Sequence, residues 1–182
     1  MRIYNFKDKQ PFIASNVFIA DNVVITGEVI IGEHTSIWFN TVIRGDVAPV
    51  IIGNRVNIQD NSVLHQSDDI PLIIEDNVTI GHQCILHSAT IKKGALIGMG
   101  SIVMDGAEIG EGAYIGAGSL VSQGKIIPPN TLAYGRPAKV IRSLTQDEQA
   151  ELVKSASHYV ESGKYYKGLL ETTRKYNQQH KL

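Results

Sequence analysis

The sequence predicts an all-β solenoid built from six-residue repeats and followed by one C-terminal α-helix. Large aliphatic residues recur at every sixth position over most of residues 13–133. A period of six fits neither the 3.6-residue period of a helix nor the alternation of a single strand, and it is typical of hexapeptide solenoids. Small or β-branched residues four positions later fit tight interior corners and support this fold. The aliphatic column consists of Ile13, Ile19, Ile25, Ile31, Ile37, Ile43, Ile52, Ile58, Leu64, Ile74, Ile80, Leu86, Ile91, Ile97, Val103, Ile109, Ile115, Val121, Ile127 and Ala133.

Chains with this repeat resemble the left-handed parallel β-helix proteins. The resemblance implies that three hexads form one triangular coil of about eighteen residues. The left-handedness of the coil is also implied only by the resemblance, because the general rule for parallel crossovers would predict a right-handed coil. Successive coils are expected to stack roughly 4.8 Å apart, the usual separation of paired strands.

The repeats divide the chain into two parts. Residues 1–142 are expected to form the β-helix domain, and residues 143–182 a C-terminal helix and tail. Residues 1–10 show no six-residue phase, which indicates a leading strand or cap. The turn-forming stretch 135–139 (Gly-Arg-Pro-Ala-Lys) ends the ladder.

A capping box predicts where the helix begins. Thr145 is followed three residues later by Glu148, the pattern of a helix N-terminus. Five later residues fall on one helical face: Leu152, Ala156, Tyr159, Val160 and Gly163. We expect this face to cover an exposed edge or end of the solenoid. The chain after Gly163 is polar, and we expect it to fray.

Composition excludes several classes of partner. The 17 basic and 18 acidic residues nearly cancel, which gives no electrostatic case for binding nucleic acid or an anionic membrane. No apolar run approaches the roughly 20 residues of a membrane span, and the N-terminus lacks a secretory signal. The one cysteine, Cys84, falls in the column of small residues, so we expect a buried filler and no disulfide. A cytoplasmic protein with a small-molecule or protein partner is expected, and a periplasmic protein without disulfides would show the same features.

Three histidines are candidate metal ligands. His82 and His87 lie in one short stretch, and His65 lies upstream. Three imidazoles with an open coordination position are what a catalytic zinc requires. Arg44, His65 and His87 each directly follow a column aliphatic, and insertions of three and four residues keep them in one column on successive coils. Strand alternation turns them outward, and two stacked imidazoles can lean onto one ion.

His82 occupies a different face of the predicted coil. His82 follows the column residue Ile80 by two positions, as Asp60 follows Ile58. We therefore expect His82 to stack over Asp60. The path round a corner to a metal held by its own chain is too long. We therefore expect His82 to come from a neighbouring subunit in a closed ring, most simply a trimer. Insertions at 45–49 and 66–71 interrupt the repeat at this corner, as expected for a functional site.

The remaining conspicuous residues have plainer interpretations. His34, His158 and His180 are expected to be structural or exposed, and Trp38 to be a packed, outward aromatic. Arg44 and Asp46 form either a surface pair of little energetic value or an ion pair at a subunit interface. Their position above His65 favours the interface.

The three candidate histidines and the motifs around them resemble those of the gamma-class carbonic anhydrases and their bacterial relatives. The resemblance covers roughly residues 10–160. Other β-helix proteins share the hexads and the glycine-proline close, whereas the histidine spacing after Asn-x-Gln-Asp is much more specific. The matching stretches are Arg44-Gly45-Asp46, Asn57-Ile58-Gln59-Asp60, His65, Gly81 to His87, the glycine-rich Ile97-Gly98-Met99-Gly100, and Gly135-Arg136-Pro137-Ala138.

The resemblance implies a homotrimer with zinc, or iron or cobalt, at each subunit interface. His65 and His87 would come from one chain and His82 from the next. The implied activity is the reversible hydration of carbon dioxide to bicarbonate by a metal-bound hydroxide. Zinc on three neutral imidazoles lowers the pKa of its bound water to roughly 7.

The resemblance also implies supporting residues. Gln59 would hydrogen-bond the metal-bound water, Asn57 and Asp60 would support the ligands, and Arg44 with Asp46 would join subunits. Tyr159 on the helix either reaches the site or serves only in packing.

One part of the family's pattern is missing. The archetypal active member has a glutamate proton shuttle in an acidic loop, whereas the first insertion here offers only residues 45–49. Asp68 and Asp69 in the second insertion are candidate substitutes.

Two other functions therefore stay open. One is a non-catalytic trimeric metal-binding or assembly protein. The other is a hexapeptide acyltransferase with one histidine as general base and acyl-coenzyme A between coils, which leaves two histidines unexplained.

Overall fold

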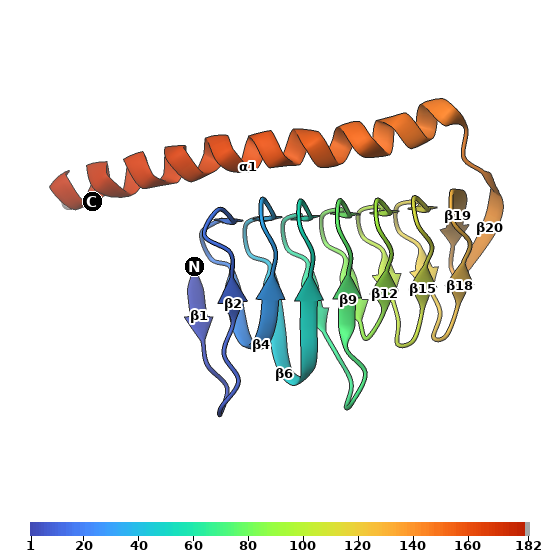
Figure 1. Cartoon of the computed structure of the whole chain (residues 1–182), viewed down its shortest axis with the longest axis horizontal. Coiled ribbons are helices and arrows are strands. Elements are labelled where there is room, and N and C mark those ends of the chain that lie inside the picture. The colour runs from blue at the N-terminus through green and yellow to red at the C-terminus, as the bar shows by residue number, and fades with distance from the viewer. Residues whose placement is uncertain (181–182) are drawn as a thin grey trace.

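The computed structural model describes residues 1–180 and confirms a parallel β-solenoid with one long C-terminal helix (Figure 1). Its strands form three faces that run the length of the coil stack. Every pairing within the faces is parallel except that of the last two strands of face 1. The helix α1 (Gln146–His180) runs along the stack.

Face 1 is the 8-stranded sheet, and faces 2 and 3 together form the 12-stranded sheet. Face 1 contains β3 (Phe18–Ile19), β5 (Ser36–Ile37), β7 (Asn57–Ile58), β10 (Thr79–Ile80), β13 (Leu96–Ile97), β16 (Tyr114–Ile115), β19 (Thr131–Gly135) and β20 (Ala138–Ser143). Face 2 contains β8 (Val63–His65), β11 (Ile85–His87), β14 (Ile102–Val103) and β17 (Leu120–Val121). Face 3 contains β2 (Phe12–Ile13), β9 (Leu72–Ile74), β12 (Thr90–Ile91), β15 (Glu108–Ile109) and β18 (Ile126–Ile127).

Two long strands join faces 2 and 3. β4 (Val24–Ile31) and β6 (Val42–Ile52) continue round the corner, and β1 (Arg2–Tyr4) pairs with the start of β4. The first insertion, residues 45–49, therefore lies inside β6 and forms no loop. Gly45 permits this because a Cβ there would lie 2.3 Å from the carbonyl oxygen of Glu28 on the adjacent coil. The second insertion, 66–71, does leave the strands as a loop.

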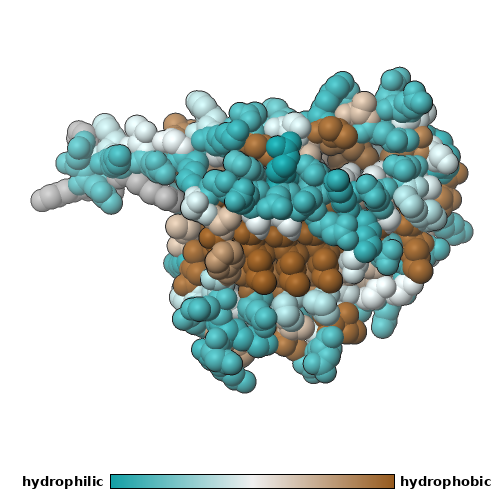
Figure 2. Space-filling model, in the orientation of Figure 1, coloured by the Kyte–Doolittle hydropathy of each residue, from teal (hydrophilic) through white to brown (hydrophobic). Residues whose placement is uncertain are grey.

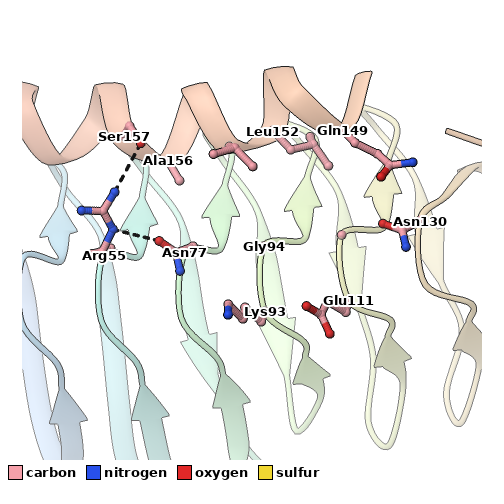
Figure 3. A pocket seen from close by; sticks show the side chains of 12 residues that line it. Arg55, Asn77, Lys93, Gly94, Glu111, Asn130, Gln149, Leu152, Ala156 and Ser157 are labelled. Carbon is pink, nitrogen blue, oxygen red and sulfur yellow. Dashed lines mark hydrogen bonds between the residues drawn. The ribbon is translucent and has the colours of Figure 1, made fainter. Parts of the chain in front are cut away.

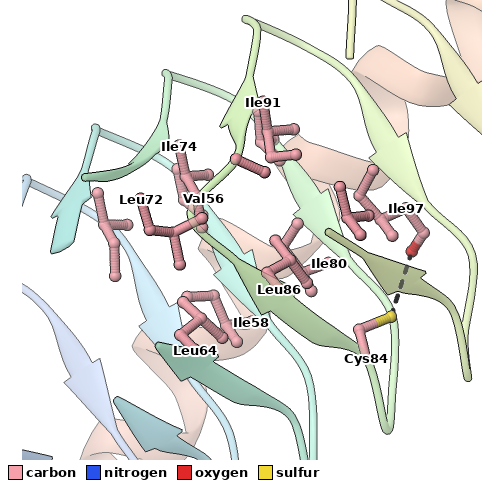
Figure 4. Close-up of a cluster of buried hydrophobic side chains, with 14 of the residues drawn as sticks. Val56, Ile58, Leu64, Leu72, Ile74, Ile80, Cys84, Leu86, Ile91 and Ile97 are labelled. Atoms are coloured by element: carbon pink, nitrogen blue, oxygen red, sulfur yellow. Dashed lines mark hydrogen bonds between the residues drawn. The ribbon is translucent and has the colours of Figure 1, made fainter. Parts of the chain in front are cut away.

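The predicted aliphatic column forms the core. From Ile25 to Ala133 every member is fully or almost fully buried, and the side chains of successive coils stack in files (Figure 4). Cys84 is completely buried in this core, and burial raises the pKa of its thiol to about 11. The prediction that Cys84 is a small filler is confirmed.

The capping box of α1 is also confirmed. The amide of Glu148 donates to Thr145 Oγ1 at 3.2 Å, and the amide of Thr145 donates to Glu148 Oε2 at 2.9 Å. Arg142 pairs with the same carboxylate, and its hydrogen bond, with that of the Thr145 amide, lowers the pKa of Glu148 to about 2.

The helix packs across the outer side of face 1, where it contacts β3, β5, β7 and β10. The expectation that it covers an exposed edge or end of the solenoid is therefore wrong in detail. Leu152, Ala156 and Val160 are buried. Trp38 lies under the helix with its ring centroid 5.6 Å from that of Tyr159 and 5.1 Å from that of Tyr166. The indole is nearly buried, which fits the expected packed aromatic.

The predicted frayed tail is wrong for residues 164–180, which continue the helix. Tyr166 and Leu170 pack against the core, and Lys167 Nζ donates to the carbonyl of Ser15 at 2.8 Å. These contacts come from the far N-terminal end of the solenoid, so the local sequence does not show them. The prediction for Lys181 and Leu182 lies outside the described residues, as does that for the His180 side chain.

Face 3 carries an apolar strip on its outer side. Phe12, Ile30, Ile51 and Ile73 are register partners on successive coils. The first three are exposed, and the strip is visible on the front of the molecule (Figure 2). Within residues 1–180, no helix is long and apolar enough to cross a bilayer.

Gly163 lets the helix approach face 1. A Cβ at this position would lie 3.1 Å from the Cβ of Ser36 and 3.4 Å from that of Phe18. We predict that Gly163→Leu lowers the thermal midpoint by about 5 °C, because overpacking costs about 1–3 kcal/mol. Gly168→Leu is the matched control, since nothing lies within 4 Å of a Cβ there. Equal melting temperatures for the two variants would contradict this packing.

Candidate functional site

The candidate residues gather in two groups on each chain. His65 and His87 are direct register partners on β8 and β11, so the predicted column on face 2 is confirmed. His82 lies in the turn between faces 1 and 2. We name the first group, with Asp46 and Asp105, the face half-site. We name the second, formed by His82, Asp60, Gln59, Asn57 and Tyr159, the corner half-site.

In the face half-site each imidazole contacts its own carboxylate. His65 Nε2 lies 3.1 Å from Asp46 Oδ1, and His87 Nδ1 lies 2.6 Å from Asp105 Oδ1. The two remaining ring nitrogens, His65 Nδ1 and His87 Nε2, face each other at 3.1 Å. All four side chains are partly buried.

The electrostatics favour ionised carboxylates. Burial alone would raise the pKa of Asp46, but hydrogen bonds from Arg44 and His65 outweigh it and lower the pKa. The pKa of Asp105 is lowered mainly by the hydroxyl of Ser67, which donates to Oδ2 at 2.6 Å, and further by His87. An ionised carboxylate only accepts, so a neutral imidazole turns its N–H toward the aspartate.

The two facing nitrogens therefore both present lone pairs. A shared proton or a metal cation can occupy such a contact. Burial lowers the pKa of His65, so a proton is disfavoured at neutral pH. Two nitrogens that each lie about 2.0–2.1 Å from a tetrahedral zinc are about 3.3 Å apart, close to the observed 3.1 Å. The donor set thus fits a zinc ion.

Asp105 was missed in the sequence. It lies one coil beyond His87, so the spacing could have revealed it, but the shortened repeat after Leu86 obscures this correspondence. Strand register places Leu86 opposite Val103, and Asp105 follows two residues later. Ser67, which contacts Asp105, belongs to the second insertion. The backbone amide of Ser67 donates to Ser88 Oγ at 2.7 Å.

Arg44 and Asp46 form an ion pair within one chain, 2.5 Å between Arg44 Nη1 and Asp46 Oδ2. Lys9 Nζ also donates to the carbonyls of Asp46 and Val47, at 3.2 and 2.9 Å. These contacts hold the carboxylate of Asp46 against His65. Arg44 stays about half exposed, with its guanidinium open to further partners.

The corner half-site repeats the carboxylate–imidazole pairing. His82 Nδ1 lies 2.8 Å from Asp60 Oδ2, as the predicted stacking of the two residues requires. The residues that follow them, Gln83 and Asn61, have φ values of 58° and 61°. This left-handed conformation turns the chain sharply at the corner and leaves the imidazole of His82 partly exposed.

Gln59 and Asn57 form a buried amide chain beside this corner. Gln59 Nε2 donates to Asn57 Oδ1 at 3.0 Å, and Asn57 Nδ2 donates to Thr79 Oγ1 at 2.8 Å. Tyr159 packs on Trp38 and lies near Asp60. Burial, and then the charge of Asp60, raise the pKa of its hydroxyl. Tyr159 therefore both packs and flanks the half-site.

The two half-sites do not meet within one chain. Among residues 1–180, no group of three His, Cys, Asp or Glu side chains converges to hold a metal. Asp68 and Asp69 lie in the exposed turn of the loop beside the face half-site. His34 and His158 have the expected structural or exposed roles. His34 sits in a turn with φ 58°, its amide bound to Asn16, and His158 is exposed on α1.

Comparisons with known proteins identify the chain's relatives. The bacterial transferase hexapeptide model matches residues 11–45 and 88–123. A carbonic anhydrase of Geobacillus kaustophilus is 70% identical over 92% of each chain. Gamma carbonic anhydrase 2 of Arabidopsis thaliana mitochondria is 35% identical over 87% of this chain and 59% of its own. A Bacillus cereus crystal structure, provisionally described as an acetyltransferase, is 68% identical with TM-score 0.92, over 92% of this chain and 98% of its own.

The contact between Asp105 and His87 predicts a ring tautomer. In the metal-free protein at mildly alkaline pH, we expect His87 to carry its proton on Nδ1. Asp105→Ala should shift this proton largely to Nε2, because the acceptor is lost. Nitrogen-15 NMR of the histidine rings measures the shift. Asp68→Ala, in the neighbouring loop, should leave the ring unchanged, and an unchanged His87 in Asp105→Ala would refute the assignment.

Proposed function

The chain belongs to the gamma-class carbonic anhydrase family, and from this premise we propose that it hydrates carbon dioxide reversibly to bicarbonate. The reaction would take place at zinc sites between the subunits of a homotrimer. His65 and His87 of one subunit and His82 of the next would hold each ion, with iron or cobalt as alternatives to zinc.

One observation carries this proposal: three histidines each contact a different aspartate at 2.6 to 3.1 Å. Metal-ligating histidines in proteins almost always donate their other ring N–H to such an acceptor. The aspartates orient the rings and leave His65 Nδ1, His87 Nε2 and His82 Nε2 for a cation. Histidines kept only for packing would not need three separate carboxylates.

A ring of subunits accounts for the separation of the half-sites. Each chain offers two nitrogens on face 2 and one at the corner, so a heterologous contact repeated round a closed ring completes every site. The half-exposed Arg44 lies at the edge of the face half-site, where it can also reach the neighbouring subunit.

Zinc held by three neutral imidazoles supplies a Lewis acid that ionises water near neutral pH. The chain's own residues supply orientation. The buried bond to Asn57 fixes the amide of Gln59, which leaves its carbonyl oxygen to align a water or bicarbonate proton. Asp60 holds His82 in one tautomer. Val63 and Ile85 point outward beside His65 and His87 and give uncharged carbon dioxide an apolar wall.

Two alternatives have some support. The acetyltransferase description of the Bacillus cereus relative favours an acyltransferase. Acyl transfer needs one histidine as general base, and it leaves the other two histidine–aspartate pairs without a role. A non-catalytic metal-binding trimer would keep all three pairs, and the absence of a glutamate in residues 45–49 favours it.

Zinc content and stopped-flow carbon dioxide hydration, measured on the same samples, test the proposal. We expect one zinc per chain and hydration well above the buffer rate. His65→Ala, His82→Ala and His87→Ala should each lose zinc affinity and activity by at least about 100-fold, more than loss of a supporting residue costs. His158→Ala, on the outer side of α1, should keep both.

Each alternative gives a different outcome. Zinc binding with carbon dioxide hydration no faster than buffer would contradict the proposed catalysis and support the non-catalytic metal-binding trimer. Thermal stabilisation by acetyl-coenzyme A, with no effect of chelation, would support the acyltransferase and contradict our proposal.

A further inference from the structure

A groove lies between α1 and the corner that joins faces 3 and 1 (Figure 3), and no residue of either half-site lines it. Its volume is about 360 Å³, within the range of small-molecule sites. The solenoid wall comes from five successive coils and the opposite wall from the first turns of the helix. Nothing in the proposed function uses this groove.

Missing side chains create the hollow. Five residues occupy the same turn position on successive coils, and all have positive φ: Arg55, Asn77, Gly94, Gly112 and Asn130. The two glycines carry no side chain in the middle of the floor. Nothing lies within 4 Å of a Cβ at Gly94, whereas Asn130 Oδ1 lies 2.6 Å from the position of a Cβ at Gly112. Longer side chains close the ends, with Arg55 at one and Asn130 facing Gln149 at the other.

Arg55 is held across one end of the groove. Its Nε donates to Asn77 Oδ1 at 2.9 Å, and its Nη2 donates to Ser157 Oγ on the helix at 3.3 Å. Both partners are neutral, so within the described part of the chain the guanidinium has no hydrogen-bonded counterion. Glu161, one turn beyond Ser157 on α1, accepts a hydrogen bond from Lys164, which is the main cause of its lowered pKa. The charge of Arg55 makes a smaller contribution to that shift. A fixed guanidinium with free N–H groups is suited to binding a carboxylate.

The remaining walls combine charge with an apolar surface. Lys93 stands beside Gly94 on the same side of the groove as Arg55, and its ammonium makes no ion pair among the described residues. Glu111 on the next coil is the one acidic lining residue. On the helix, Leu152, Val153 and Ala156 offer hydrocarbon.

We propose that this groove binds a small organic acid, with its carboxylate between Arg55 and Lys93 and its hydrocarbon part along Leu152 and Ala156. Of the charged residues that line this groove, the two cations outnumber the one carboxylate, Glu111, and this favours an anion. The apolar helix wall favours a hydrocarbon body over a bare inorganic anion. This site is independent of the proposed metal chemistry, so either can fail without the other.

Octanoate is the probe, titrated into the complete protein and followed by NMR and calorimetry. We expect saturable binding of one octanoate per chain in the millimolar range, usual for a ligand of this size. Resonance shifts should be confined to the groove residues. Arg55→Gln should weaken binding about tenfold, because a charge-assisted hydrogen bond is lost.

The chain contains a matched control for the charge. Lys93→Gln should weaken octanoate binding several-fold, whereas Lys92→Gln should not, since Lys92 pairs with Glu75 at 3.2 Å outside the groove. Octanamide, the uncharged analogue, should bind much more weakly than octanoate.

Three results would overturn the proposal. The first is no saturable binding. The second is equal affinity for octanamide, and the third is binding abolished by Phe12→Ser, which would place octanoate on the apolar strip of face 3.

Discussion

The stacking of one coil on the next is the constraint on which the rest of this structure depends. Parallel backbone hydrogen bonds link each coil to its neighbours, for example from the amide of Ile85 to the carbonyl of Ser101 at 2.9 Å. This pairing fixes which side chains are neighbours across coils. It buries the aliphatics in the core and, on the outer side, places His65 against His87. A register shift of one residue would turn every one of these side chains to the opposite side.

The same stacking supplies the electrostatics of the half-sites. Asp46, Asp60 and Asp105 each lie on a coil adjacent to that of the histidine they contact. Ionised carboxylates there fix the ring tautomers, and burial of His65 discourages a proton between the facing nitrogens. The site thus needs little from long loops. The one loop that takes part, residues 66–71, supplies the Ser67 hydroxyl behind Asp105.

Much of this arrangement follows from the sequence because a solenoid converts spacing directly into position. The six-residue period was enough to predict the buried column, the shared column of His65 and His87, and the stacking of His82 on Asp60. The role of Asp105 was not predicted because a shortened repeat changes the residue spacing between the paired positions Leu86 and Val103. The continuation of the helix beyond Gly163 was not predicted because it depends on contacts with residues distant in sequence. Tyr166 contacts Phe18, and Lys167 contacts Ser15. The first insertion was expected to interrupt a corner, but glycines at 27 and 45 allow continuous strands there.

The central claim is that each chain carries two incomplete half-sites that are completed by a second copy. Dissociating and reassembling equal amounts of His65→Ala and His82→Ala chains, followed by zinc analysis, tests it most directly. Random mixing in a closed trimer gives one intact site in each mixed ring, so about one quarter of all sites should recover zinc. Neither variant alone should recover any. If the mixture binds no more zinc than the separate variants, the ligands are not divided between chains and the account is contradicted.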